Sequence, residues 1–255
     1  MPPVALFDDG RHRNLLLDDF GGGVGVQSNQ HIVQEGGSAL ILDPGGHGLY
    51  SRAAAATSAL LSPATLRYIV LSHQDPDALG ALNGWLMLSD ADAFISALFL
   101  RFIPHFGLDD LVAHRLRPLP DEGRWIDLEG AKLAALPAHF LPSQGGFQLY
   151  DPVSKILYTG DLGASFGAPY REVEDFDAHV RHMDVFHRRR MASRSALRAW
   201  AAMVRGLDVE LLAPQHGAFF RGRALVRRFV EWCEGLECGT DLMTDVYRIP
   251  PGWTP

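Results

Sequence analysis

Cysteine and lysine are both scarce in this chain, and each scarcity limits the functions it can have. The only cysteines, Cys233 and Cys238, cannot build a disulfide framework, so a reducing compartment is expected. Lys132 and Lys155 are the only lysines, and the positive charge is otherwise arginine. The net charge of −7 gives no reason to expect nucleic acid or an anionic membrane as a partner.

Long apolar runs are also missing. No stretch reaches the roughly 20 apolar residues that a membrane-spanning helix needs, and the first residues lack the basic and then apolar pattern of a secretion signal. We therefore expect a cytoplasmic protein without a membrane partner. The chain has 255 residues, 47% of them hydrophobic, and no linker interrupts its strand and helix signals, so one domain over residues 1–255 is predicted.

Strand and helix patterns alternate along the chain. Residues 24–34 and 38–43 are predicted to form a hairpin through Gly36 and Gly37, and residues 146–150 and 155–160 a second one. Apolar residues recur at helical steps near 78–89, 98–106, 174–190, 194–205 and 222–235. The alternation suits two stacked sheets covered by helices, since parallel strands need both faces covered.

Ligand-type side chains follow a predicted strand over residues 66–71. His73, Asp75 and Asp77 occupy alternate positions there, and Pro76 between the two carboxylates favours a tight turn that can direct them to different ions. The simpler interpretation is an acidic loop in which Asp77 caps the following helix. Both interpretations fit this segment alone.

Three further ligand-type residues occur in the same local setting. His139 ends the apolar run 132–138, Asp161 ends 156–160, and His216 follows 209–215. Loops at strand ends hold ligands on a rigid scaffold, and strand ends of one sheet lie side by side. Two divalent ions about 3.5–4 Å apart need several anionic oxygens, completed by imidazoles, so the six residues predict a binuclear metal site.

These residues resemble the metallo-β-lactamase superfamily, in particular its di-iron branch of flavodiiron and oxygen-binding di-iron proteins. The hairpin, the turn Asp43-Pro44-Gly45 and the ligand motifs carry the resemblance over nearly the whole chain. It implies an α/β fold, a metallo-β-lactamase-like αββα four-layer sandwich. Hydrolytic members have His at the third place of the first motif, where this chain has the carboxylate of Asp75, and a hard oxygen favours iron or manganese over zinc.

The resemblance also implies a distribution of ligands over two iron ions, with manganese or zinc as alternatives. Asp161 bridges the ions in this pattern. The first ion is held by His73, Asp75, His139 and Asp161, and the second by Asp77, Asp161 and His216. The closing His of the family motif falls on Ala78, which has no ligand atom, so the second ion would have three protein ligands.

Three classes of function stay open. The first is a di-iron protein that binds, senses or reduces O2 or NO; because a flavodoxin domain is not expected within residues 1–255, reduction would need a separate electron donor. The second is a metal-dependent hydrolase, and the third a non-enzymatic module in which metal serves stability. A redox or signalling protein and a second copy of the chain in a homodimer are the candidate protein partners.

Other motifs have simpler interpretations. His179, His182 and His187 lie in an arginine-rich segment that would repel a cation, so a solvated helical face is favoured over a ligand pair. The run 188–190 of three arginines is likewise interpreted as a solvated face. Phe140, Phe166 and the pair at 219–220 either form an apolar vestibule beside the metal site or belong to the core.

Overall fold

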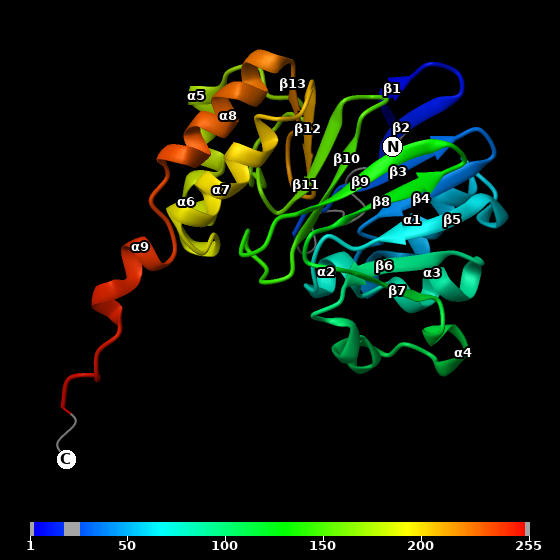
Figure 1. The fold of residues 1–255 in the computed structure, drawn as a ribbon, viewed down its shortest axis with the longest axis horizontal. Helices are drawn as coiled ribbons and strands as arrows, with labels where there is room; N and C mark the ends of the chain where they lie inside the picture. Colours follow the sequence, from blue (N-terminus) through cyan, green and yellow to red (C-terminus); the bar gives the residue numbers. More distant parts are fainter. Residues whose placement is uncertain (1–2, 18–25, 253–255) are drawn as a thin grey trace.

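Two mixed β-sheets face each other in the computed structural model, which describes residues 3–17 and 26–252 (Figure 1). Among these residues the first sheet has the strand order β1-β2-β3-β4-β5-β6-β7 and the second the order β13-β12-β11-β10-β9-β8. The strands are β1 (Val4–Asp8), β2 (His12–Leu17), β3 (Gln30–Glu35), β4 (Ser38–Leu42), β5 (Leu66–Val70), β6 (Asp92–Ser96), β7 (Leu116–Leu119), β8 (Arg124–Leu128), β9 (Ala131–Pro137), β10 (Phe147–Asp151), β11 (Ile156–Gly160), β12 (Leu211–Pro214) and β13 (Phe220–Arg221).

Helices cover the outer face of each sheet. The first sheet carries α1 (Tyr50–Ser58), α2 (Pro76–Leu79), α3 (Leu82–Leu88) and α4 (Asp110–Ala113). The second sheet carries α5 (Phe176–His179), α6 (Asp184–Arg190), α7 (Arg194–Val204) and α8 (Arg223–Gly235), and α9 (Thr240–Met243) lies in a C-terminal segment that projects from the body (Figure 1). The predicted αββα four-layer sandwich is confirmed.

Period-two alternation of apolar residues explains the layers. In β11, Ile156 and Tyr158 enter the core between the sheets, whereas Leu157 packs against the helices outside. In β4, Leu40 and Leu42 face the inner core in the same way. Successive side chains of a strand point to opposite faces, so a strand buried on both faces must be apolar throughout.

Several predicted elements differ in detail. The hairpin is formed by β3 and β4, and residues 24–25 of the prediction lie outside the described residues. The helix expected over 78–89 is two short helices, and the one over 98–106 is a 3-10 helix at Leu100–Phe106 that contains Pro104. The segment 174–190 is divided into α5, a 3-10 turn and α6. Propensity alone does not show such breaks, because tertiary packing decides them.

Four strands end at one edge of the sandwich. β4, β5 and β6 run parallel in the first sheet, and β11 and β12 run parallel in the second. Because β10 is antiparallel to both β9 and β11, β9 runs in the same direction as β11. Contacts between the Ser72 and Phe147 backbones and between His73 and Asp161 bring the ends of the two sheets together, so the residues after β5, β9, β11 and β12 emerge at a common edge, where ligand-binding loops are expected.

Candidate metal centre

His73 emerges from β5 with its ring held from behind. Nδ1 of His73 lies 2.7 Å from the Ser72 hydroxyl, which donates to Asp43 Oδ2 at 2.8 Å while the Ser72 backbone N–H donates to Asp43 Oδ1. A hydroxyl that donates to a carboxylate is left to accept from the imidazole, so Nδ1 carries the proton. The lone pair of Nε2 then points away from this chain of hydrogen bonds. All three side chains are buried.

His216 is held in the same manner by a different partner. Its Nδ1 donates to the carbonyl oxygen of Gln27 at 2.6 Å, and its Nε2 lies 3.3 Å from both Asp77 Oδ2 and Asp161 Oδ1. Burial lowers the pKa of His216, but the two carboxylates outweigh burial and raise it to about 10. The following residue, Gly217, has φ +78°, and a Cβ there would lie 2.1 Å from Ser165 Oγ, so only glycine fits this turn.

Asp161 lies at the centre of the cluster. Its Oδ1 is 3.9 Å from His73 Nε2 and 3.3 Å from His216 Nε2, and the side chain is 4% exposed. Burial raises the pKa of Asp161, whereas the hydrogen bond from His216 and the charge of His73 lower it, with a net value of about 2. An ionised carboxylate between two imidazoles is the arrangement that a bridging ligand needs.

Asp75 and Asp77 come from the first turn of α2. Asp75 occupies the N-cap position but its side chain caps no N–H group; its Oδ2 lies 3.9 Å from His73 Nε2 instead. Asp77 is inside the helix and faces His216, so the interpretation of Asp77 as a helix cap is wrong. Ligand atoms of His73, Asp75 and Asp77 all lie within 4.8 Å of one another. Ala78, beside them, is fully buried.

His139 lies on the loop after β9, which packs against the His73 segment. The backbone N–H of Phe147 donates to the Ser72 carbonyl at 2.7 Å, and Ser143 contacts Gln74. Nε2 of His139 donates to the Asp121 carbonyl at 2.9 Å. Its Nδ1 is buried and has no hydrogen-bond partner within the described residues.

The donor set fits a metal pair. Each of the three imidazoles has one nitrogen held by a hydroxyl or a backbone carbonyl, as in protein metal sites. In the described part of the chain the other nitrogen is unpaired in His73 and His139, whereas in His216 it carries a proton toward Asp77 and Asp161 that a bound metal ion would displace. Within the described residues His73 Nε2 and His139 Nδ1 are buried without a hydrogen-bond partner. Buried polar atoms are normally paired, so two unpaired imidazole nitrogens beside carboxylates indicate a missing partner of positive charge.

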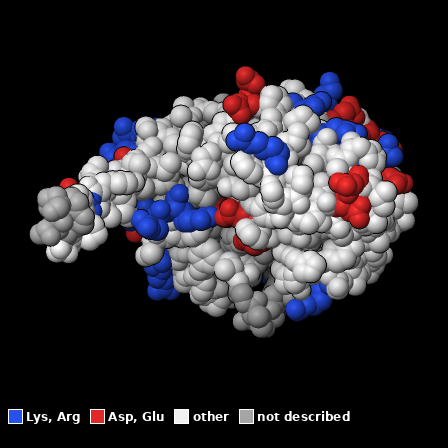
Figure 2. All heavy atoms as spheres, turned by 90° about the horizontal axis from the view of Figure 1, so that it is seen from below, with Lys and Arg blue, Asp and Glu red and all other residues white. Residues whose placement is uncertain are grey.

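Arg190 is part of this site, although a solvated face was expected for the run 188–190. It ends α6, and its Nη2 donates to Asp75 Oδ2 at 2.6 Å and lies 3.4 Å from Asp161 Oδ2. Figure 2 shows basic side chains beside a small acidic group near the middle of the face seen from below. Three consecutive arginines gave no signal that the third would turn inward.

The histidines of the arginine-rich segment do not form the solvated face that was expected. His179 and His187 are fully buried, whereas His182 is half-buried. Burial lowers the pKa of His187 to about 4, and this neutral ring donates from Nδ1 to the Met183 carbonyl and accepts at Nε2 from Gly163 N–H, both at 2.8 Å. His187 therefore supports the loop that follows Asp161.

Aromatic residues divide between the site and the core. Phe166 packs on the ring of His216, with centroids 5.7 Å apart, and on Phe186 at 5.1 Å. Phe219 and Phe220 are buried in the core, so the vestibule hypothesis fails for them. An apolar cavity of about 290 Å³ borders the His139 loop, between Leu141 and the α7 residues Ala196, Trp200 and Met203.

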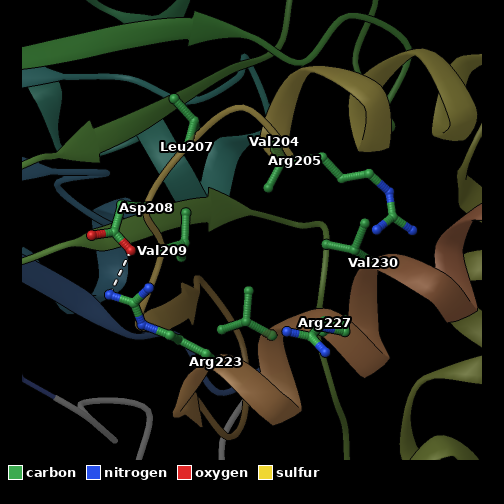
Figure 3. Close-up of a pocket in the computed structure, with 9 residues that line it drawn as sticks. Val204, Arg205, Leu207, Asp208, Val209, Arg223, Arg227 and Val230 are labelled. Atoms are coloured by element: carbon green, nitrogen blue, oxygen red, sulfur yellow. Dashed lines mark ion pairs between the residues drawn. The ribbon is translucent and has the colours of Figure 1, made fainter.

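A second cavity of about 210 Å³ lies between α7, α8 and the segment before β12 (Figure 3). Arg223 and Asp208 form an ion pair at 2.7 Å at its edge. The cavity lies at the start of β12, whereas His216 follows the end of the same strand. It is therefore separate from the metal centre.

Facing sheets with outer helices, and a cluster of His and Asp at one sheet edge, define a protein of the metallo-β-lactamase superfamily in its di-iron branch. The chain belongs to the family described as ODP family beta lactamase, whose model matches residues 26–217. A search of the curated proteins finds no match. Within the described residues, none of the helices combines the length and apolar character needed to cross a bilayer.

Solved structures extend the comparison. The chain is similar to a structure described as a peroxy diiron species of chemotaxis sensor ODP, with 37% identity, a TM-score of 0.87 and coverage of 97% of this chain and 100% of that chain. The apo state of chemotaxis sensor ODP from T. denticola shares 36% identity, a TM-score of 0.85 and coverage of 96% and 99%. A mutant flavo di-iron protein from Thermotoga maritima has the same fold at 18% identity and a TM-score of 0.75, over 91% of this chain and 60% of that chain.

Proposed function

We propose that this protein is a non-haem di-iron protein that binds O2 or NO and acts as a sensor, with a signalling or redox protein as its partner. One observation carries the proposal: six His and Asp side chains follow strand ends at one edge of the sandwich, with imidazole nitrogens of His73 and His216 directed at Asp161. The likeness to the chemotaxis sensor ODP, described as a peroxy diiron species, supports iron and a sensing role.

The proposed ligands divide into two groups that share Asp161. His73, Asp75, His139 and Asp161 hold one iron ion, and Asp77, Asp161 and His216 hold the other. Three carboxylates give hard oxygen donors, which favour iron or manganese over zinc. When bound, two reduced iron ions supply electrons and open coordination positions for a diatomic ligand.

The surrounding residues prepare the site for a small uncharged ligand. Ser72 and Gln27 hold the rings of His73 and His216, so that Nε2 of each ring faces Asp161. The ring of Phe166 covers one side of His216, and the apolar cavity borders the His139 loop. Apolar surface beside these two imidazoles suits O2 or NO better than a charged substrate.

The test uses anaerobic reconstitution. Metal-free protein is loaded with Fe²⁺ without air, its iron content is measured, and its visible spectrum is recorded before and after exposure to O2 and, separately, to NO. We expect about two iron ions per chain and a new absorption band with at least one of the gases. A two-iron sample that stays spectrally silent with both gases would contradict the proposal. Zinc-only binding together with esterase turnover would favour the hydrolase.

A further inference from the structure

Arg190 and the metal centre share a carboxylate oxygen. Asp75 Oδ2 accepts a hydrogen bond from Arg190 Nη2 at 2.6 Å and is also the Asp75 atom 3.9 Å from His73 Nε2. Asp161 Oδ2 lies 3.4 Å from the same Nη2. The guanidinium therefore contacts two of the proposed ligands, and at Asp75 it is bonded to the oxygen that faces His73.

A guanidinium and a divalent ion repel each other when both bind the same carboxylate oxygen. Both are cations, and at a separation of a few ångströms their repulsion is large wherever water is partly excluded. Arg190 cannot lose its charge to relieve this repulsion, because arginine stays protonated in proteins. Movement of its side chain relieves this repulsion.

The surroundings of Arg190 allow that movement. Its side chain is 43% exposed and that of Asp75 is 30% exposed, whereas Asp161 is 4% exposed. The Arg190 Cζ also lies 5.8 Å from the centroid of the Phe186 ring, which offers the guanidinium a second favourable contact.

The backbone around Arg190 is held in place. Ala192 N–H donates to the Phe140 carbonyl at 3.2 Å, and the Ala192 carbonyl accepts from Thr240 N–H at 2.8 Å. The Arg188 carbonyl accepts from Gly239 N–H at 2.8 Å. If Asp75 changes its partner, the Arg190 side chain therefore moves and α6 stays in place.

We propose that Arg190 is a built-in competitor of the first metal ion: the guanidinium and the metal are alternative partners of Asp75, so that metal binding releases Arg190 into solvent. The proposal rests on the proposed metal centre but not on its reaction with O2. Arg190 lowers metal affinity and stabilises the metal-free site, because without it the carboxylate of Asp75 would lose its hydrogen-bonded counter-cation.

The first test is a titration of the metal-free full chain with Mn²⁺ under anaerobic conditions, by competition with a fluorescent chelator. We expect Arg190→Gln to bind its first Mn²⁺ at least about tenfold more tightly than the parent protein, within the range usual for coupled binding. Its metal-free form should melt at a lower temperature, and its Mn²⁺-loaded form at a temperature close to that of the parent. The matched control is Arg189→Gln, since Arg189 Nη1 contacts Met243 Sδ; it should bind Mn²⁺ like the parent.

A second measurement needs no variant. The parent protein is labelled with phenylglyoxal, which modifies arginine, with and without Mn²⁺, and the modified peptides are quantified by mass spectrometry. Labelling of Arg190 should rise severalfold with Mn²⁺, while labelling of Arg189 stays constant as the internal reference.

Unchanged or weaker Mn²⁺ binding by Arg190→Gln, or labelling of Arg190 that does not respond to Mn²⁺, would overturn the proposal while leaving the metal centre intact. A parent protein that binds no Mn²⁺, Fe²⁺ or Zn²⁺ would remove both this proposal and the metal centre. Normal Mn²⁺ exchange in a protein that ignores O2 and NO would support the role of Arg190 and contradict only the sensing function.

Discussion

Nδ1 of His73 donates to the hydroxyl of Ser72 at 2.7 Å, and that hydroxyl donates in turn to the buried carboxylate of Asp43. The turn that contains Asp43 thus reaches the metal centre through one hydroxyl group. Outer hydrogen bonds of this kind orient a ligand imidazole and fix its tautomer.

Ser72→Ala removes this connection and should weaken metal binding by about 10- to 100-fold, the loss usual when an outer partner of a ligand is removed. It should also cost about 1–3 kcal/mol of stability, because Asp43 loses a partner in the interior. Chelator competition with Mn²⁺ and denaturant unfolding of the metal-free protein measure the two effects. Ser154→Ala, a buried serine in the turn between β10 and β11, is the control. Equal metal affinity of Ser72→Ala and Ser154→Ala would show that the hydroxyl does not position His73.

His139→Ala should remove metal from the first site and weaken the second through the shared Asp161. The metal ligand atom lost in this variant is the buried Nδ1 of His139, because Nε2 already donates to the Asp121 carbonyl. Metal analysis after equilibration with Fe²⁺ under nitrogen measures the stoichiometry, and His105→Ala in the 3-10 helix Leu100–Phe106 serves as the control. Two metal ions per chain in both variants would exclude His139 from the ligand set.

The sequence predicts those residues of the metal centre that directly follow a strand. Asp161 and His216 each follow an apolar run, and parallel neighbouring strands bring their carboxyl ends to one edge, so local pattern and topology agree. Arg190 gave no such signal, because its partner Asp75 lies 115 residues earlier and only packing of α6 on the second sheet brings the two together. His187 was missed for the same reason.

A buried ionic cluster at the other end of the sandwich should make stability depend on pH. His12 Nδ1 contacts Glu35 Oε2 at 2.9 Å and His12 Nε2 contacts Asp151 Oδ2 at 2.6 Å, so both nitrogens act as donors and the ring is an imidazolium. Burial lowers the pKa of His12, but Asp151 and Glu35 outweigh it and raise the pKa above 6.5. Burial raises the pKa of each carboxyl, whereas its partners lower it below the ordinary 3.8 for Asp151 and 4.5 for Glu35.

The sign of the pH dependence follows from these directions. The raised pKa of His12 gives stability that is complete below pH 6.5 and is lost as the pH rises through the raised value. The lowered pKa values of the carboxyls give stability that is present above pH 4.5 and is lost as the pH falls. The difference in unfolding free energy between the parent and His12→Gln should therefore be largest between pH 4.5 and 6.5 and shrink toward alkaline pH. Urea unfolding in chelator from pH 4 to pH 10 measures it, and a constant difference would contradict the assignment.

Replacing His187 tests whether a neutral imidazole holds the loop after Asp161. With His187→Phe, an aromatic ring is retained but Gly163 N–H loses its acceptor, which should cost about 1–3 kcal/mol in the interior. The displaced loop should also weaken Mn²⁺ binding, because Asp161 is two residues before Gly163. His182→Phe, on a half-buried ring in the same segment, is the control for aromatic replacement. A His187→Phe protein that is destabilised but binds Mn²⁺ with parental affinity would limit His187 to a structural role and separate this loop from the metal centre.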